Sequence, residues 1–183
     1  MDSNILETPK WYALSVFSRQ EKAAVSELTK FGLESFLPYS VVRRAWSDRI
    51  KSLQVALFPG YLFVHTALSG KTRLELLRIR QVFDIVGRRK TENGPVFQSV
   101  PDYQIESLKL LMTTKRELEP IQQLVKGTEV RIMQGPFKGI HGVIDREPDG
   151  IHRQMVVQVP LLGRGVKVQI SADDLLSIHE LAA

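Results

Sequence analysis

The hydrophobic pattern of this chain changes its period between residues 113 and 123. Upstream, strand-like runs alternate with apolar residues at helical spacing, whereas downstream only short strand-like runs remain. A period of about 3.6 residues is typical of helices and a period of two is typical of strands, so such a switch indicates two domains of different class. The stretch TTKRELEPIQQ between them is charged and lacks an apolar stripe, so we predict a flexible linker there. The predicted boundaries are 8–113 for the first domain, 114–123 for the linker and 124–180 for the second domain.

The first domain is predicted to be α+β, with the order β-α-β-β-α-β and one appended helix. Ser18 stands three residues before Glu21, the spacing of a capping box, and Gly32 stands where that helix is expected to end. Ser69 and Pro101 are placed to begin two further helices. This order is that of the ferredoxin-like fold, an antiparallel sheet with helices on one face. The expected strands cover 11–17, 34–42, 53–66 and 82–86, and a polar, basic connection covers 43–51.

The second domain is predicted to be a small, all-β antiparallel barrel. EVRIM, GVID, MVVQV and VKVQI are short strand candidates, and the segments between them carry turn signals. Gly127, Gly139 and Gly142 fit the tight turns and close backbone approaches of a small barrel.

The positive charge of the chain is unevenly distributed. The formal net charge is +5. Residues 1–114 hold 16 Lys and Arg against 11 Asp and Glu, whereas residues 115–183 hold nine of each. A basic first domain suggests contact with nucleic acid or another polyanion. A solvated surface with a modest positive bias remains the alternative.

Several function classes are disfavoured by what the sequence lacks. It contains no cysteine, which removes disulfides and thiolate metal sites and fits a reducing compartment. No apolar run approaches the length of a membrane span and no secretory signal is visible, so we expect a cytoplasmic protein. The four histidines are scattered and no catalytic motif is present, so we expect no enzyme activity, cofactor or metal.

The stretch LFPGYLFV, residues 57–64, concentrates aromatic side chains around a Pro-Gly turn. One interpretation is a buried strand entered through a turn, and the other is an aromatic surface for a partner. On a strand, Tyr61 and Phe63 share one face while Leu62 and Val64 point to the other. One of these two pairs must belong to the core.

Two sets of motifs resemble a known family. GPFKGIHG, residues 135–142, resembles the KOW motif of SH3-like barrels, and WYAL, LFPGYLFV and VFDIVG resemble the N-terminal domain of the NusG family. The resemblance covers Trp11 to about Ile178. It implies a non-catalytic transcription elongation regulator that binds RNA polymerase, promotes processive elongation or antitermination, and recruits a partner through its KOW domain. The segment 43–64 resembles specialised RfaH-like or polysaccharide-operon paralogues more than the general factor.

The resemblance also implies three groups of site residues. Those expected to contact the clamp helices of the polymerase β′ subunit are Phe58, Pro59, Tyr61, Phe63, Val82, Phe83 and Ile85. Those expected to contact nucleic acid, such as the non-template DNA strand, are Arg19, Lys22, Arg43, Arg44, Trp46, Arg49, Lys71, Arg73 and Arg80. Those expected to bind a small-subunit ribosomal protein or Rho through the KOW domain are Pro136, Phe137 and Lys138.

Alternatives stay open at several of these positions. Each aromatic residue in 57–64 could be core instead of contact, Trp46 could fold onto the sheet, and Phe137 could close one end of the barrel. For the whole chain, the alternatives are a general NusG that assists Rho-dependent termination and a ribosome-associated KOW protein. A monomer is expected in each case.

Overall fold

The computed structural model describes residues 8–45, 50–92, 94–114, 118–122, 127–132, 137–145, 153–170 and 178–180. The chain divides into two compact units. Unit 1 combines residues 1–37 with 58–102, and unit 2 combines residues 38–57 with 103–183.

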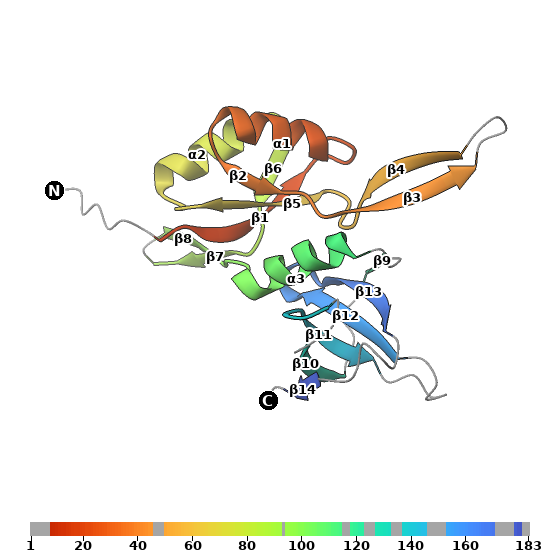
Figure 1. Ribbon diagram of the computed structural model, residues 1–183. Helices are drawn as coiled ribbons and strands as arrows, with labels where there is room; N and C mark the ends of the chain where they lie inside the picture. The colour runs from red at the N-terminus through yellow and green to blue at the C-terminus, as the bar shows by residue number, and fades with distance from the viewer. Residues whose placement is uncertain are drawn as a thin grey trace. The chain divides into compact units, whose positions relative to one another are not determined.

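Unit 1 is built on a four-stranded antiparallel sheet. Its strands are β1 (Lys10–Val16), β2 (Glu34–Phe36), β5 (Tyr61–Thr66) and β6 (Val82–Ile85), in the order β2-β5-β1-β6. The helices α1 (Glu21–Lys30) and α2 (Gly70–Arg78) lie on one face of this sheet (Figure 1). This arrangement confirms the predicted α+β, ferredoxin-like fold.

The main core of unit 1 lies between this sheet and the two helices. Alternate residues of β1 and β5 point into it, as a period of two requires. Leu62 and Val64 therefore belong to this core, together with apolar residues of both helices. The cluster consists of Tyr12, Leu14, Val16, Ala24, Leu28, Leu62, Val64, Leu76, Ile79, Val82 and Ile85.

The two helices of unit 1 begin differently. Ser69 caps α2, since its Oγ accepts a hydrogen bond from the Thr72 N–H at 3.1 Å, which confirms the prediction. The predicted capping box of α1 is wrong. Gln20 is its N-cap, without a side-chain cap bond, and the Glu21 carboxylate bonds elsewhere in the fold. Gly32, at φ 70°, follows the C-cap of α1 as predicted.

Unit 1 also contains a short hairpin, which the sequence pattern did not reveal. It consists of β7 (Arg88–Thr91) and β8 (Gly94–Phe97), paired in antiparallel fashion. After it, Val100 forms an isolated bridge with Trp11, which ties the end of the unit back to β1.

Unit 2 contains a six-stranded antiparallel sheet. Its order is β14-β10-β11-β12-β13-β9, and the 3-10 turn η1 (Pro160–Leu162) joins β12 to β13. The strands span Leu118–Ile121 (β9), Thr128–Ile132 (β10), His141–Asp145 (β11), Arg153–Val159 (β12), Arg164–Ile170 (β13) and Ile178–Glu180 (β14). The four strand candidates of the predicted barrel correspond to β10 to β13.

Two further elements fall in unit 2. The strands β3 (Tyr39–Ala45) and β4 (Ile50–Ala56) pair as a two-stranded ribbon (Figure 1). The helix α3 (Asp102–Thr113) belongs to this unit from Tyr103 onward.

Three predictions about local structure need correction. The expected strand 34–42 is two strands, β2 and β3, which belong to different sheets. The expected connection 43–51 lies partly inside the ribbon, since β3 and β4 pair with each other and not with the main sheet. The expected linker 114–123 contains β9, whose backbone pairs with β13 and whose Leu118 is buried.

Candidate functional site

The turn between β4 and β5 is held by three hydrogen bonds of its backbone groups. The Gly60 carbonyl accepts from the Val16 N–H at 2.9 Å, and the Gly60 N–H donates to Glu21 Oε1 at 2.9 Å. The Tyr61 N–H donates to the Phe58 carbonyl at 3.0 Å. Gly60 adopts φ 82°, a conformation that favours glycine. The segment 58–61 is therefore fixed to both β1 and α1.

An aromatic cluster lies next to this turn. Phe63 packs against Phe36 and Phe58, with ring centroids 6.2 and 6.3 Å apart, and Trp11 contacts Phe36 at 6.5 Å. The side chains of Phe58 and Phe63 are almost fully buried, whereas Pro59 is exposed and Tyr61 is half-buried. Both faces of β5 therefore bury apolar side chains, and Pro59 and Tyr61 are the accessible members of the predicted aromatic surface.

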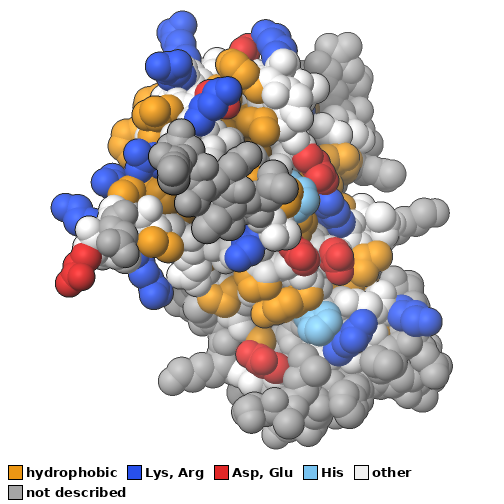
Figure 2. Space-filling model, turned by 90° about the vertical axis from the view of Figure 1, so that its left-hand side faces the viewer, with side chains coloured by type: hydrophobic (Ala, Val, Ile, Leu, Met, Phe, Trp, Pro, Cys, Tyr) orange, Lys and Arg blue, Asp and Glu red, His pale blue; other side chains and the backbone are white. Residues whose placement is uncertain are grey.

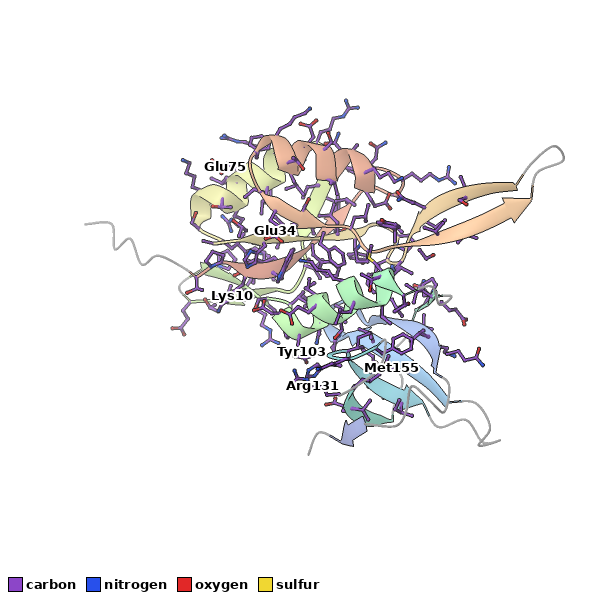
Figure 3. The ribbon with its side chains drawn as sticks, in the orientation of Figure 1. Lys10, Glu34, Glu75, Tyr103, Arg131 and Met155 are labelled. Atoms are coloured by element: carbon purple, nitrogen blue, oxygen red, sulfur yellow. The ribbon has the colours of Figure 1, made fainter. Side chains whose placement is uncertain are left out.

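A histidine continues this cluster along β5. The His65 ring lies 5.0 Å from the Trp11 ring at a tilt of 33°, and its Nδ1 lies 3.3 Å from Oε2 of Glu34. Glu34 is on β2, which pairs with β5 directly opposite His65, and it is labelled in Figure 3. The cluster thus has a polar group at one end.

The candidates on β6 separate into core and surface. Val82 and Ile85 lie in the core under the two helices, so burial argues against a contact role for either. Phe83 is 67% exposed and forms an edge-to-face pair with Phe17, which is 53% exposed. The sequence analysis missed Phe17. The sequence feature that could have revealed it is an aromatic residue between the end of a strand and a polar turn.

The predicted basic residues of unit 1 lie on or beside two of its helices. Arg19 lies between β1 and α1, Lys22 lies in the first turn of α1, and Arg80 lies between α2 and β6; all three are exposed. Lys71 and Arg73 lie in the first turn of α2, where Lys71 Nζ is 3.9 Å from Glu75 Oε1. Figure 2 shows Lys and Arg side chains spread over the face it draws, interleaved with hydrophobic ones.

The remaining basic candidates lie on the β3–β4 ribbon or outside the described residues. In the register of the ribbon, Arg43 is opposite Ser52 and Arg44 is opposite Lys51. Trp46 and Arg49 lie outside the described residues.

The turn before β11 does not expose its aromatic side chain. Phe137 is 1% exposed, so it belongs to the core of unit 2, while Lys138 is exposed. The turn folds back because the Gly139 N–H donates to the Ile132 carbonyl at 2.8 Å and the Ile140 N–H to the Phe137 carbonyl at 3.1 Å. Pro136 lies outside the described residues.

The helix α3 contacts the start of β11 through polar groups. The Ser107 Oγ accepts from the His141 N–H at 2.9 Å and donates to the Tyr103 carbonyl at 2.7 Å. The Tyr103 ring lies 4.9 Å from the His141 ring. Figure 3 labels Tyr103 on α3 and Arg131 on β10. The spacing of apolar residues in α3 did not predict this contact, because Ser107 is a polar residue outside the apolar stripe of the helix.

The surroundings of His141 lower its pKa from the ordinary value of 6.5. Burial is the largest cause, because it disfavours the charged imidazolium. The Arg131 guanidinium lowers the pKa further, and the Glu106 carboxylate raises it.

Comparison with known proteins assigns the chain to a family. A family model described as NusG, transcription termination factor, matches residues 9–109, which is more than half of the 183 residues. The chain belongs to the NusG family. This is a family of transcription termination and antitermination factors. The matched span includes residues 9–37 and 58–102 of unit 1, with the turn 58–61, and residues 38–57 and 103–109 of unit 2.

Two NusG relatives match over almost their whole length. The transcription termination/antitermination protein NusG of Pasteurella multocida is 24% identical over 171 residues, covering 88% of this chain and 91% of the relative. The NusG of Haemophilus influenzae is 23% identical over 180 residues, covering 93% and 95%. Both alignments therefore include residues of both units of this chain.

A solved NusG structure supports the fold. The structure titled "Domain interaction in Thermotoga maritima NusG" covers 96% of this chain and 98% of its own, with a TM-score of 0.51 and 20% identity. At this identity the likeness concerns the fold alone.

Two further observations on the described residues complete the picture of this NusG family member. Within those ranges, no group of three or more potential ligands is placed to hold a metal ion. Among the same residues, no helix has the length and apolar character needed to cross a membrane.

Proposed function

We propose that this chain is a non-catalytic transcription elongation regulator that binds RNA polymerase through its N-terminal part. The observation that carries the proposal is the turn 58–61, because it presents accessible groups on a rigid base. Residues that are pre-organised bind with a smaller loss of conformational entropy. We take the clamp helices of the β′ subunit as the partner, and 8–113 and 124–180 as the two functional domains, with β9 in the segment 114–123 between them paired to β13 of the second domain.

The contact in this proposal is made by Pro59 and Tyr61. Phe58 and Phe63 are buried, so their role is to hold the turn against the aromatic cluster. A Tyr ring buries much area at little cost in rotamer freedom, which suits a groove between helices. Preferential binding to the closed clamp then favours processive elongation, as a shift in population.

The KOW domain in this proposal recruits a second partner, a small-subunit ribosomal protein or Rho. Because Phe137 is core, Lys138 is the accessible side chain among the described residues of that turn. Tethering raises the effective concentration of the recruited partner near the polymerase. Such a factor acts in the cytoplasm, as a monomer bound to each polymerase.

The test is a pull-down of core RNA polymerase by the full chain. Wild type and the control Phe31→Ala, an exposed aromatic residue at the end of α1, are expected to retain polymerase. Tyr61→Ala is expected to bind at least tenfold more weakly while its circular dichroism spectrum stays unchanged. Failure of the wild type to bind would overturn the proposal and make the ribosome the next bait.

A transcription assay distinguishes the two directions of regulation. We expect the wild type to increase read-through at a terminator, and Tyr61→Ala to lose this effect. Increased release that depends on added Rho would instead identify a general factor that assists termination.

A further inference from the structure

A pocket lies at one end of the unit 1 sheet, between the start of β1, the β7–β8 hairpin and the loop that joins β5 to α2. Its volume is about 360 Å³, which is large enough to hold a side chain or a small ligand. The chain around the start of β1 contributes Thr8, Lys10 and Tyr12, because every second side chain of an extended segment lies on the same face. Lys10 is labelled in Figure 3.

The rest of the pocket lining is apolar. Leu68 and Phe97 are partly buried and pack against the core of unit 1. Pro95 and Val96 on β8 are exposed, and the side chain of Val96 is 54% exposed. The pocket therefore combines a part supported by the core with an apolar wall that a partner can reach from solvent. Such a wall gains free energy when a ligand covers it.

Basic side chains of β7 lie beside this lining. All four residues of β7 are exposed, and three of them are Arg88, Arg89 and Lys90. The antiparallel register places Arg88 opposite Phe97 and Lys90 opposite Pro95. Because directly opposite residues of two paired strands point to the same side, these cations stand next to the lining residues of β8. Lys10 and the three basic residues of β7 are called the cationic rim below.

The charge of the cationic rim is largely uncompensated. Among the described residues, no carboxylate forms an ion pair with Lys10, Arg88 or Lys90. Glu92, in the turn of the hairpin, is the one acidic residue of the segment 88–97. The four cations of the rim and this carboxylate together give a formal charge of +3. A rim of this charge attracts an anionic partner.

We propose that this pocket is a docking site for a short acidic peptide of a partner protein. One apolar side chain of the peptide enters the pocket against Leu68 and Val96, and carboxylates on either side bind the cationic rim. Carboxylates form strong, charge-assisted hydrogen bonds with Arg and Lys. Basic clusters that read acidic segments are a recurring mode of peptide recognition, and the pocket adds selection for the apolar residue.

The chemistry of the lining favours a peptide over a nucleic acid. Bases need an accessible aromatic face on which to stack. The two aromatic residues of the lining, Tyr12 and Phe97, both pack against the core. Phosphate contacts alone need no apolar pocket. The pocket shares no residue with the turn 58–61, so the inference goes beyond the proposed polymerase contact and does not depend on it.

The test measures binding of the full chain to fluorescein-labelled peptides of about eight residues by fluorescence anisotropy. Each peptide carries one leucine, phenylalanine or tryptophan between aspartates. We expect the full chain to bind at least one of these peptides, with an affinity that falls as salt is added. Replacing the aspartates by asparagine, or the apolar residue by glycine, is expected to weaken binding about tenfold or more.

One pair of variants tests the apolar wall. Val96→Asp places a negative charge on the wall and is expected to weaken peptide binding about tenfold or more. The matched control is Val41→Asp on β3, where the valine is 59% exposed, and it is expected to bind like wild type. Circular dichroism checks that both variants fold.

A second pair of variants tests the cationic rim. Lys10→Gln with Arg88→Gln is expected to weaken peptide binding about tenfold. Lys30→Gln with Arg78→Gln removes the same amount of charge from the last turns of α1 and α2, where both residues are exposed. This control is expected to stay within about twofold of wild type, because charges away from the pocket act only through the screened field of the whole protein.

Several outcomes would overturn the docking site. It is overturned if no peptide binds at low salt, or if Val96→Asp binds the peptides as tightly as wild type. Binding of duplex DNA that is lost in the Lys10→Gln, Arg88→Gln variant, without peptide binding, would assign the rim to nucleic acid. A peptide of residues 1–7 that binds more tightly than the others would make this chain its own occupant. A dimer in sedimentation velocity that Val96→Asp abolishes would make a second copy the occupant.

The polymerase pull-down separates this inference from the proposed function. Val96→Asp is expected to retain core polymerase, and its loss would assign the pocket to the polymerase contact and overturn a separate docking site. If wild type fails to bind polymerase but binds the acidic peptides through Val96 and Lys10, the proposed function fails and the docking site stands.

Discussion

The carboxylate of Glu21 on α1 accepts a hydrogen bond from the backbone N–H of Gly60, 2.9 Å away and 39 residues along the chain. Glu21 is buried, and Gly60 lies in the turn that presents Pro59 and Tyr61. One acidic side chain therefore connects the first helix of unit 1 to its proposed polymerase contact.

Removing that acceptor is expected to destabilise the protein. Glu21→Ala leaves the Gly60 N–H without its carboxylate, and we expect a loss of about 1 to 3 kcal/mol in the free energy of unfolding. Urea denaturation followed by circular dichroism measures it. The control is Glu27→Ala, whose carboxylate pairs with Lys30 at 2.7 Å on the surface. That variant is expected to lose about 0.5 kcal/mol or less. Equal losses in both variants would contradict a special role for the Glu21 bond.

Gly142 on β11 is expected to tolerate no side chain. A Cβ there would lie 2.9 Å from both the Val156 carbonyl oxygen and Met155 Cγ. We expect Gly142→Ala to cost about 1 to 3 kcal/mol, because the neighbouring strand must move to accept the methyl group. Gly70→Ala is the control, since its Cβ meets nothing within 4 Å. It is expected to be neutral or to stabilise by about 0.5 kcal/mol. Thermal denaturation of both variants checks the pair, and a neutral Gly142→Ala would show that β12 adjusts freely.

Ser107 is expected to secure α3 to β11. It is fully buried, and its hydroxyl satisfies both the His141 N–H and the Tyr103 carbonyl. We expect Ser107→Ala to cost about 1 to 3 kcal/mol. We also expect faster hydrogen exchange at the His141 amide, measured by NMR. Ser26→Ala, at an exposed position of α1, should leave that exchange rate unchanged. An unchanged rate in Ser107→Ala would mean that α3 does not protect this amide.

The stability of unit 2 is expected to fall as the pH falls. The folded surroundings of His141 hold its pKa below the ordinary value of 6.5, so the unfolded chain binds the proton more readily. The stabilising contribution is therefore complete above about pH 6.5 and is lost as the pH drops toward the lowered pKa.

His141→Gln is expected to flatten this part of the stability profile, measured as the urea midpoint at several pH values. Arg131→Gln is expected to weaken it partially, because the Arg131 charge contributes to the lowered pKa. A His141→Gln variant with the wild-type slope would assign the pH dependence to another group.

Local signals predicted a large part of this fold. The change of period after residue 113 separates the helix-containing part of the chain from the part with short strands, as in the structure. Ser69 caps its helix because the cap bond joins residues three apart. Gly32 ends α1 for the same local reason, since a positive φ is a property of one residue.

Local signals failed where a polar group had a choice of partners. Glu21 has the spacing of a capping box with Ser18, but its carboxylate bonds Gly60 instead. The residues of β9 look like a linker, yet their backbone completes the edge of a sheet beside β13. A hydrogen bond can be made to any partner that the fold brings near, so sequence spacing alone does not select it.

By itself, the sequence determined the class of each domain and the family motifs, because these depend on the order of neighbouring residues. Only the tertiary structure decided that Phe63 and Phe137 are buried while Phe17 and Phe83 are exposed. It also decided that Tyr61 and Pro59 are the accessible part of LFPGYLFV. The physical reason is that exposure depends on what lies across from a side chain, and those neighbours come from strands and helices far away in the chain.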